Sequence, residues 1–373
     1  VFGCFLDFNL NSSKFLICKN IYNNIMNIVI FGISGDISNK KVIPGLYELF
    51  TELENNNNNI NNIIGYGRTK FTEKSYIDMI KYNKNIDNPS DEFLNLFSYI
   101  SGQYNELEGY KKIYDKLSDG YNKKILFYFG IPSQLTPNCM NLINDCGFND
   151  NFECKYMIEK PVGNNLTKSN QIFESIYNTI QENQLFIVDH YLAKTSIYNN
   201  SFDGNIKSLN IYLNEKEDVN HRISYFDEVG IFKDMVQSHV MVIFLFLIPD
   251  IFNKYEKIKI NNVKMGQYID YSGQKKVNTF IRLNLNYNGI DITIETGKKL
   301  KKNRKEIIYV TQDNVKKYIK LKSKNYGKEY KILFQDVFLN KKEKFLTNDN
   351  IKYFWLVSDH IWDRIKDTEL FYY

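Results

Sequence analysis

The sequence predicts an N-terminal α/β domain with a doubly wound parallel sheet, followed by an α+β domain with a mainly antiparallel sheet and helices. Three observations predict this class. Up to about residue 190, short apolar runs of β type alternate with segments of helical periodicity, as in a parallel sheet covered by helices. The first run ends in a glycine-containing turn that opens a helix. Beyond residue 200, apolar and polar residues alternate within the strands, which is typical of an antiparallel sheet with one solvated face.

The parallel sheet is predicted strand by strand. Residues 28–31 form the first apolar run, and residues 41–50 after the turn have the apolar spacing of a helix. A second run at residues 63–66 ends at Gly67 and Arg68, and further runs follow at 125–129 and 156–158. Strands that alternate with helices in this way favour a doubly wound sheet, which binds ligands beyond the carboxyl ends of its strands.

The second half contains alternating strands at residues 208–213 and 279–285, with a long helix predicted between them at 230–247. We therefore expect a poorly ordered extension over residues 1–26, a first domain over 27–194 and a second over 195–373. A chain of 373 residues exceeds an ordinary single core, which agrees with two packed units.

The composition excludes several classes of protein. Hydrophobic residues make up 43% and charged residues 24%, which is the range of globular proteins. The net charge of +5 is spread along the chain, so nucleic-acid binding is not implied. No apolar run reaches the roughly 18 residues of a membrane span, so no membrane partner is expected. The five cysteines lack metal-ligand spacing, so no metal site is predicted and a reducing, cytoplasmic setting fits best.

The turn after the first strand contains Gly32 and Gly35. Glycines at this point let the backbone approach a pyrophosphate, whose charge lies at a helix N-terminus. The pattern predicts a dinucleotide site of the Rossmann type. An ordinary strand–helix turn is the alternative, because Ser38 stands in place of a third glycine.

The residue after the second strand indicates which dinucleotide binds. Sites for NAD place a carboxylate at this point to bind the ribose hydroxyls, whereas the 2′-phosphate of NADP needs a cation. Here Arg68 and Lys70 follow the strand. The sequence favours NADP over NAD, with a surface ion pair as the other interpretation of Arg68.

Two later segments group acids, histidines and a lysine. His190, Tyr191 and Lys194 supply three types of phosphate donor within one turn. Oxidation of an alcohol needs a base that takes the hydroxyl proton, and a histidine oriented by a carboxylate suits neutral pH. His239 is the candidate base. Each histidine taken singly is more often structural, but their occurrence together with a dinucleotide turn favours catalysis.

From residue 28 onward the chain resembles the glucose-6-phosphate dehydrogenase family. Gly32-Ile-Ser-Gly-Asp-Ile-Ser-Asn-Lys-Lys41 resembles the coenzyme turn of that family, and Ser98-Tyr-Ile-Ser-Gly-Gln-Tyr104 resembles a second coenzyme segment. Three further motifs are the most specific: Glu159-Lys-Pro-Val-Gly163, Asp189-His-Tyr-Leu-Ala-Lys194 and Tyr225-Phe-Asp-Glu-Val-Gly-Ile-Phe-Lys-Asp-Met-Val-Gln-Ser-His239.

The resemblance implies oxidation of glucose 6-phosphate to 6-phosphogluconolactone with hydride transfer to NADP, the first step of the oxidative pentose phosphate pathway. It implies that His239 is the general base, that Asp189 orients it, and that Lys160 reaches substrate and nicotinamide beside a cis Pro161. The implied substrate-binding residues are His190, Tyr191 and Lys194 for the phosphate, and Glu215, Asp234 and Lys298 for the sugar. The implied cofactor-binding residues are Gly32, Ser34, Gly35, Asp36, Ile37, Lys41, Arg68, Tyr104 and Lys160.

The chain departs from the family pattern mainly after Lys305. A long segment of the family's sheet, with a substrate-binding glutamine, has no counterpart, so we expect a reduced sheet. Glu295 stands where many members have an arginine for a second, structural NADP, and the chain stops at Tyr373 without the family's tail. That sheet normally forms the interface of a homodimer, so a dimer is expected only with part of its interface missing.

Two alternatives remain open. One is a catalytically weak or inactive protein that binds sugar phosphate and NADP. The other is a dehydrogenase of another sugar phosphate. Retention of Lys160, Asp189 and His239 argues against the first, because a pocket that only binds has no chemical need for all three.

Overall fold

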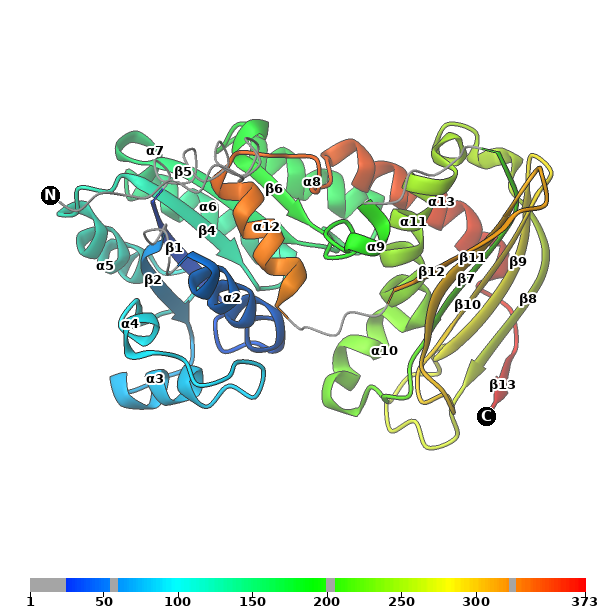
Figure 1. The fold of residues 1–373 in the computed structure, drawn as a ribbon, viewed down its shortest axis with the longest axis horizontal. Coiled ribbons are helices and arrows are strands. Elements are labelled where there is room, and N and C mark those ends of the chain that lie inside the picture. The colour runs from blue at the N-terminus through cyan, green and yellow to red at the C-terminus, as the bar shows by residue number, and fades with distance from the viewer. Residues whose placement is uncertain (1–24, 54–59, 199–204, 322–326) are drawn as a thin grey trace, which may run out of the picture. The chain divides into compact units, whose positions relative to one another are not determined.

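The computed structural model describes residues 25–53, 60–198, 205–321 and 327–373. The predicted extension lies outside the described residues except for Ile25 and Met26, and Met26 begins the first strand. The chain forms two compact units. Unit 1 comprises Val1–Glu159, Glu174–Val188 and Asn325–Phe345, and unit 2 comprises Lys160–Phe173, Asp189–Lys324 and Leu346–Tyr373. Figure 1 shows the order of the elements.

Unit 1 is built on a six-stranded parallel sheet with strand order β3-β2-β1-β4-β5-β6. This order is that of the Rossmann fold, in which the strand order reverses between β1 and β4. The predicted parallel sheet is therefore confirmed. The strands are β1 (Met26–Phe31), β2 (Ile60–Gly67), β3 (Phe97–Ser101), β4 (Lys124–Phe129), β5 (Glu153–Glu159) and β6 (Leu185–Val188).

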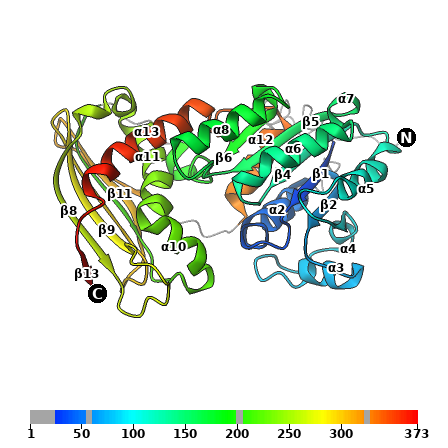
Figure 2. The same cartoon turned by 180° about the vertical axis from the view of Figure 1, so that it is seen from behind.

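Helices cover both faces of this sheet, with α2 and α12 on one side and α6 on the other (Figures 1 and 2). The helical elements of unit 1 are η1 (Ser38–Val42), α2 (Ile43–Leu53), α3 (Glu73–Lys81), α4 (Asp91–Leu94), α5 (Leu107–Ser118), η2 (Ser133–Leu135), α6 (Thr136–Asp145), α7 (Phe148–Asn151), η3 (Glu182–Gln184) and α12 (Lys328–Phe338), while α8 (Leu166–Tyr177) is divided between the units. The buried strands are almost wholly apolar, as expected for a sheet covered on both faces.

The units differ from the predicted division at residue 194. Residues 160–173 and 189–194 belong to unit 2, and α12 returns to unit 1 from late in the chain. The return depends on close packing of α12 against α2: a Cβ added to Gly45 would lie 2.6 Å from Cβ of Tyr330, and one added to Gly327 would lie 2.6 Å from the carbonyl of Pro44. Such a long-range contact leaves no local mark in the sequence.

Unit 2 contains a seven-stranded sheet with order β12-β11-β7-β10-β9-β8-β13. Only the pairs β10–β7 and β13–β8 are parallel, so the predicted mainly antiparallel sheet is confirmed. The strands are β7 (Ile206–Asn214), β8 (Lys259–Gln267), β9 (Phe280–Tyr287), β10 (Ile290–Gly297), β11 (Arg304–Thr311), β12 (Lys316–Lys320) and β13 (Leu370–Tyr372).

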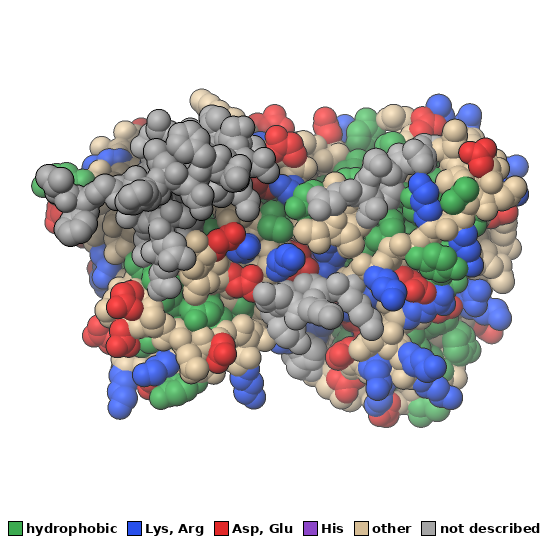
Figure 3. Space-filling model, viewed as in Figure 1, with side chains coloured by type: hydrophobic (Ala, Val, Ile, Leu, Met, Phe, Trp, Pro, Cys, Tyr) green, Lys and Arg blue, Asp and Glu red, His purple; other side chains and the backbone are tan. Residues whose placement is uncertain are grey.

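One face of this sheet is apolar and the other is polar. Leu209, Ile211 and Leu213 of β7 are buried, whereas Tyr212, which alternates with them, is paired in register with Glu295 of β10. The edge strand β12 carries Lys316, Lys317 and Lys320, and such charged side chains discourage pairing with another chain. Figure 3 shows Lys and Arg side chains interspersed with Asp and Glu side chains on the face of unit 2 that is in view.

The remaining helices of unit 2 support the sheet. They are α9 (Thr195–Tyr198), η4 (Asn220–Arg222), α10 (Ile223–Ile231), η5 (Phe232–Val240), α11 (Met241–Leu247), η6 (Pro249–Phe252), η7 (Tyr255–Lys257) and α13 (Asn348–Ile365). Among the described residues, one helical run, Ile223–Leu247, is long and apolar enough to cross a membrane, but it is kinked at Gly230 and 72% of its most apolar window is buried within the protein. This burial is typical of a core helix.

Candidate active site

The glycine turn after β1 forms a cradle at the point where the strand order of unit 1 reverses. Gly32 has a φ of +79°, which favours glycine, and an added Cβ would lie 2.6 Å from the carbonyl oxygen of Gly130. Its amide donates to Tyr66 O at 2.9 Å, and its carbonyl accepts from the Ser38 hydroxyl at 2.9 Å. Ser38 thus closes the turn in place of the third glycine.

The predicted coenzyme residues of unit 1 follow strands that end at one edge of the sheet. The guanidinium of Arg68, after β2, lies 5.7 Å from the ring centroid of Tyr104, after β3. The Tyr99 hydroxyl donates to Thr69 O at 2.6 Å, which fixes the loop that carries Arg68. Ser34, Asp36 and Arg68 are exposed or half-buried, as ligand contacts require. A cradle beside a cation, with no carboxylate directly after β2, fits NADP.

The segment after β6 is a compact turn in unit 2. The Tyr191 amide donates to Oδ1 of Asp189 at 2.8 Å, and the Lys194 amide donates to Tyr191 O at 3.1 Å. The side chain of Asp189 therefore accepts a hydrogen bond from the backbone of its own turn, as aspartate side chains do in many loops. The turn places His190, Tyr191 and Lys194 together, with Lys194 Nζ 5.4 Å from the ring centroid of Tyr191.

His239 meets this turn from η5. Its ring stacks on Tyr191 with centroids 4.2 Å apart, and its centroid lies 5.1 Å from that of His190. Its Nδ1 lies 3.7 Å from Oδ2 of Asp189, which is longer than a hydrogen bond, and has no hydrogen-bond partner among the described residues. The predicted base, its carboxylate and the predicted phosphate ligands thus lie in one cluster.

Lys160 enters the same cluster. Its ammonium pairs with Asp189 and donates to the main-chain oxygen of Ser238. The side chains of Lys160 and Asp189 are 4% and 0% exposed, so the pair is removed from water. The Lys160–Pro161 peptide is cis, as the resemblance implies.

These surroundings shift the pKa values of the acid and the base. Burial lowers the pKa of the His239 imidazole below its ordinary value, and Asp189 opposes this shift. Burial alone would raise the pKa of Asp189, but Lys160, and after it His239, outweigh burial and hold the pKa of this carboxyl well below its usual range. At neutral pH the pair is therefore a carboxylate beside a neutral imidazole.

η5 is a π-helix, a form that often occurs at functional sites. The Ser238 hydroxyl donates to Lys233 O at 3.0 Å, and the Met241 amide donates to Val236 O, each five residues back. The wider turn places Asp234 and His239, five residues apart, on the same helical segment.

Asp234 belongs to a second cluster with Glu215 and Lys298. Glu215 and Lys298 directly follow β7 and β10, which are parallel neighbours with Asn214 opposite Gly297, so the two side chains lie together. Lys298 pairs with Glu215 and lies 3.0 Å from Oδ2 of Asp234. The structure thus brings the three predicted sugar ligands together.

Sequence analysis missed two cations of this cluster. Arg222 donates to both carboxylate oxygens of Asp234, at 3.1 and 3.2 Å, and Lys305 pairs with Glu215. Burial alone would raise the pKa of Glu215, but Lys298 and Lys305 outweigh burial and lower this pKa to about 2. Lys305 ends a basic run over residues 298–305 whose spacing does not reveal this partner, and Arg222 carried no local signal beyond its place before the Tyr225 motif.

Two family models match the chain. The model described as "Glucose-6-phosphate dehydrogenase, NAD binding domain" matches residues 29–199, and the one described as "Glucose-6-phosphate dehydrogenase, C-terminal domain" matches residues 193–280. Together they span more than half of the 373 residues. The chain belongs to the glucose-6-phosphate dehydrogenase family. The predicted family, oxidoreductase class and NAD(P)-binding domain are confirmed.

Curated relatives agree with this membership. Glucose-6-phosphate 1-dehydrogenase of Cyberlindnera jadinii is 24% identical, over 93% of this chain and 90% of the relative. The enzyme of Borreliella burgdorferi is 27% identical, over 75% of this chain and 70% of its own length. An Arabidopsis thaliana relative named "Glucose-6-phosphate 1-dehydrogenase 6, cytoplasmic" is 27% identical, over 76% of this chain and 66% of the relative.

Solved structures of the same family share the fold. Glucose-6-phosphate 1-dehydrogenase from Mycobacterium avium matches with a TM-score of 0.75 and 18% identity, covering 94% of each chain. A glucose-6-phosphate dehydrogenase in complex with its substrate matches with the same TM-score and 21% identity, again over 94% of each chain. The two-domain fold predicted from the sequence is that of the family.

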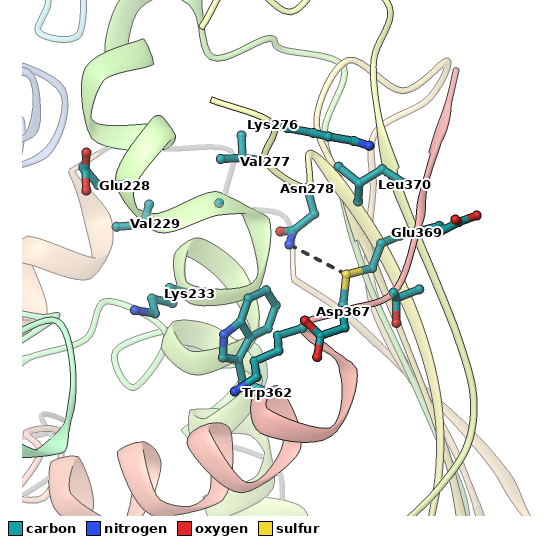
Figure 4. Close-up of a pocket in the computed structure, with 14 residues that line it drawn as sticks. Glu228, Val229, Lys233, Lys276, Val277, Asn278, Trp362, Asp367, Glu369 and Leu370 are labelled. Atoms are coloured by element: carbon teal, nitrogen blue, oxygen red, sulfur yellow. Dashed lines mark hydrogen bonds between the residues drawn. The ribbon is translucent and has the colours of Figure 1, made fainter. Parts of the chain in front are cut away.

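A cavity of about 430 Å³ lies elsewhere in unit 2, lined by Trp362, Asn278 and several charged residues (Figure 4). None of the predicted site residues lines it. The ammonium ends of Lys233 and Lys276 lie at opposite sides of the view, and the Asn278 amide is occupied by Met265 Sδ at 3.8 Å. The charges therefore do not converge on one ligand position.

Proposed function

We propose that the chain oxidises glucose 6-phosphate at C1 to 6-phosphogluconolactone, with NADP as coenzyme and His239 as general base. One observation carries the proposal. His239 and Asp189 lie in the same cluster as His190, Tyr191 and Lys194, so a proton acceptor and phosphate donors share one site. A metabolite that offers both a hydroxyl to oxidise and a phosphate to bind matches this cluster.

The proton moves to His239. Nδ1 faces Asp189, which leaves Nε2 as the nitrogen that takes the proton from the C1 hydroxyl. Asp189 favours the imidazolium that forms and keeps the ring oriented. NADP, when bound, supplies the acceptor of the hydride that leaves C1, so the alcohol becomes the lactone carbonyl with a two-electron balance.

The remaining residues bind and orient the sugar. Lys194, with His190 and Tyr191, offers donors to the 6-phosphate. The carboxylates of Glu215 and Asp234 accept hydrogen bonds from sugar hydroxyls, while Lys298 fixes both carboxylates. Lys160 pairs with Asp189 beside the base, which supports a contact of its ammonium with the substrate near the reacting carbon.

Arg68 selects the coenzyme. A cation after β2 matches the 2′-phosphate of NADP, which NAD lacks. In unit 1, Gly32, Ser34, Gly35, Asp36 and Ile37 of the turn would hold the pyrophosphate, with Lys41 and Tyr104 completing the coenzyme contacts. We also place the activity in the cytoplasm, as two plant relatives are named cytoplasmic and Cys139, Cys146 and Cys154 are free thiols.

The test follows NADPH absorbance with purified full-length protein, glucose 6-phosphate and either NADP or NAD. We expect turnover with NADP, and an Arg68→Ala variant should raise the KM for NADP about 10- to 100-fold while that for NAD changes little. Lys81→Ala, an exposed lysine on α3, is the matched control. If the protein bound both ligands without turnover, it would be a sugar-phosphate-binding protein and not this enzyme. If it oxidised only another sugar phosphate, the assigned substrate would be wrong.

A further inference from the structure

A half-buried carboxylate that accepts two hydrogen bonds directly precedes Lys160. Oε1 of Glu159, the last residue of β5, accepts from the Tyr128 hydroxyl at 2.7 Å and from the Tyr330 hydroxyl at 2.8 Å. Both tyrosines are fully buried. The mechanism proposed above uses neither tyrosine, so their arrangement requires a separate explanation.

The two donors reach Glu159 by different routes. Tyr128 lies on β4, the parallel neighbour of β5, and faces Met157 in register, two residues before Glu159. Tyr330 lies in the first turn of α12 and is 171 residues from Glu159 in sequence. It reaches the strand only because Gly45 of α2 has no side chain where Cβ of Tyr330 lies.

The Tyr128 hydroxyl remains a donor at physiological pH. Burial, and then the adjacent Glu159 carboxylate, raise the pKa of Tyr128 well above its ordinary value. Charge-assisted hydrogen bonds of this kind are short and strong, and an acceptor that loses one of them moves or draws in water. The end of β5 is therefore held by side chains from β4 and α12.

We propose that Tyr330 and Tyr128 are positioning residues for Lys160, because they hold the Glu159 carboxylate and so fix the strand end from which Lys160 extends. The proposal rests on the proposed function. Lys160 Nζ must meet both Asp189 and the main-chain oxygen of Ser238, next to the base, and its chain begins one peptide beyond Glu159. A change in the direction of the strand end would change the direction in which the chain of Lys160 leaves it.

The expected effect is on the chemical step rather than on sugar binding. A misplacement of about 1 Å in an active site can lower turnover about 100-fold. Tyr330→Phe should therefore reduce kcat about 10- to 100-fold, whereas the KM for glucose 6-phosphate should change by less than about threefold, since His190, Tyr191 and Lys194 keep their side chains.

The matched control is Tyr156→Phe. Tyr156 is fully buried on the same strand, three residues before Glu159, but its hydroxyl donates to Asn149 Oδ1. Wild type, Tyr330→Phe, Tyr128→Phe and Tyr156→Phe are compared by kcat, KM and the isotope effect with glucose 6-phosphate deuterated at C1. Both Glu159-directed variants should lower kcat and raise the isotope effect, because the hydride step becomes more limiting, and Tyr156→Phe should change neither.

A second readout works without turnover. Lys160 lowers and Asp189 raises the pKa of His239, so any shift of Lys160 alters the imidazole titration measured by NMR. Tyr330→Phe should move that titration and Tyr156→Phe should not. Equal behaviour of Tyr330→Phe and Tyr156→Phe in both readouts, or a loss confined to KM, would overturn the positioning role. An inactive wild type whose titration still responds to Tyr330→Phe would instead sink the proposed function alone.

Discussion

The two ends of η5 differ in how their functional side chains are paired. The carboxylate near the first end has cationic partners, whereas the histidine near the other end lacks a hydrogen-bond partner at one nitrogen. At the first end, Asp234 is paired with Lys298 at 3.0 Å and with both nitrogens of the Arg222 fork. At the other end, His239 Nδ1 has no hydrogen-bond partner among the described residues and lies 3.7 Å from Asp189. One helical segment thus presents a fully paired charge and an incompletely paired base.

This difference in pairing indicates that one end of η5 orients the substrate and the other end transfers the proton. A buried charge with two cationic partners is held in one geometry, which suits a residue that orients sugar hydroxyls. A buried imidazole with a spare nitrogen can gain and lose a proton without breaking a network. We therefore assign orientation to the Asp234 end and proton transfer to the His239 end, and each of the following variants tests that division.

Removal of the base should have the largest effect. His239→Asn keeps a polar side chain of similar reach but has no proton acceptor of suitable pKa, so kcat should fall about 10²- to 10⁴-fold. Thermal unfolding of the variant should stay close to wild type, because Nδ1 loses no hydrogen bond. If His239→Asn lost stability but kept turnover, His239 would have a structural role and not a catalytic one.

Removal of the central cation at the other end should instead reduce stability. Lys298 is 2% exposed and contacts two carboxylates, so Lys298→Met should lower the free energy of unfolding by about 3 kcal/mol, measured with chemical denaturant. Lys299→Met is the control, since that exposed lysine pairs with Asp270 at the surface and should cost less than about 1 kcal/mol. If both variants lowered the free energy of unfolding equally, the assignment of Lys298 to a buried, fully paired cluster would be wrong.

Asp189 should set the acid limb of activity. Burial places the pKa of His239 below its ordinary value of about 6.5, so kcat/KM should stay high down to that range and fall as the imidazole becomes protonated at lower pH. Asp189 opposes the effect of burial, so Asp189→Asn should move this limb to still lower pH and reduce kcat about 100-fold. A limb that moves to higher pH would contradict the assigned pairing.

The smallest effect is expected at the phosphate ligands. Lys194→Ala removes one cationic donor beside Tyr191, so the KM for glucose 6-phosphate should rise about 10-fold with kcat nearly unchanged. Free glucose should be affected less. If phosphorylated and free glucose lose equally, Lys194 does not bind the phosphate.

The features that could be predicted from the sequence are those that the spacing of neighbouring residues determines. The strand, turn and helix around Gly32 and the turn from Asp189 to Lys194 appear at the expected places because neighbouring residues alone define them. Their meeting with His239 followed from the family resemblance rather than from periodicity.

The rest depends on contacts between distant segments. Arg222, Lys305 and Tyr330 became visible only once the fold placed them against Asp234, Glu215 and Glu159. The return of α12 to unit 1 likewise depends on two glycine contacts with no local signature. Pairing of buried charges is decided by which strands lie side by side, and single-sequence patterns do not contain that register.

The most direct test of the central claim measures binding and turnover together in His239→Asn. Calorimetric titration with glucose 6-phosphate and absorbance of NADPH are recorded on the same preparations of wild type and variant. We expect the dissociation constant to change by less than about threefold while turnover falls at least about 100-fold. A variant that binds the sugar phosphate and still reduces NADP near the wild-type rate would contradict it.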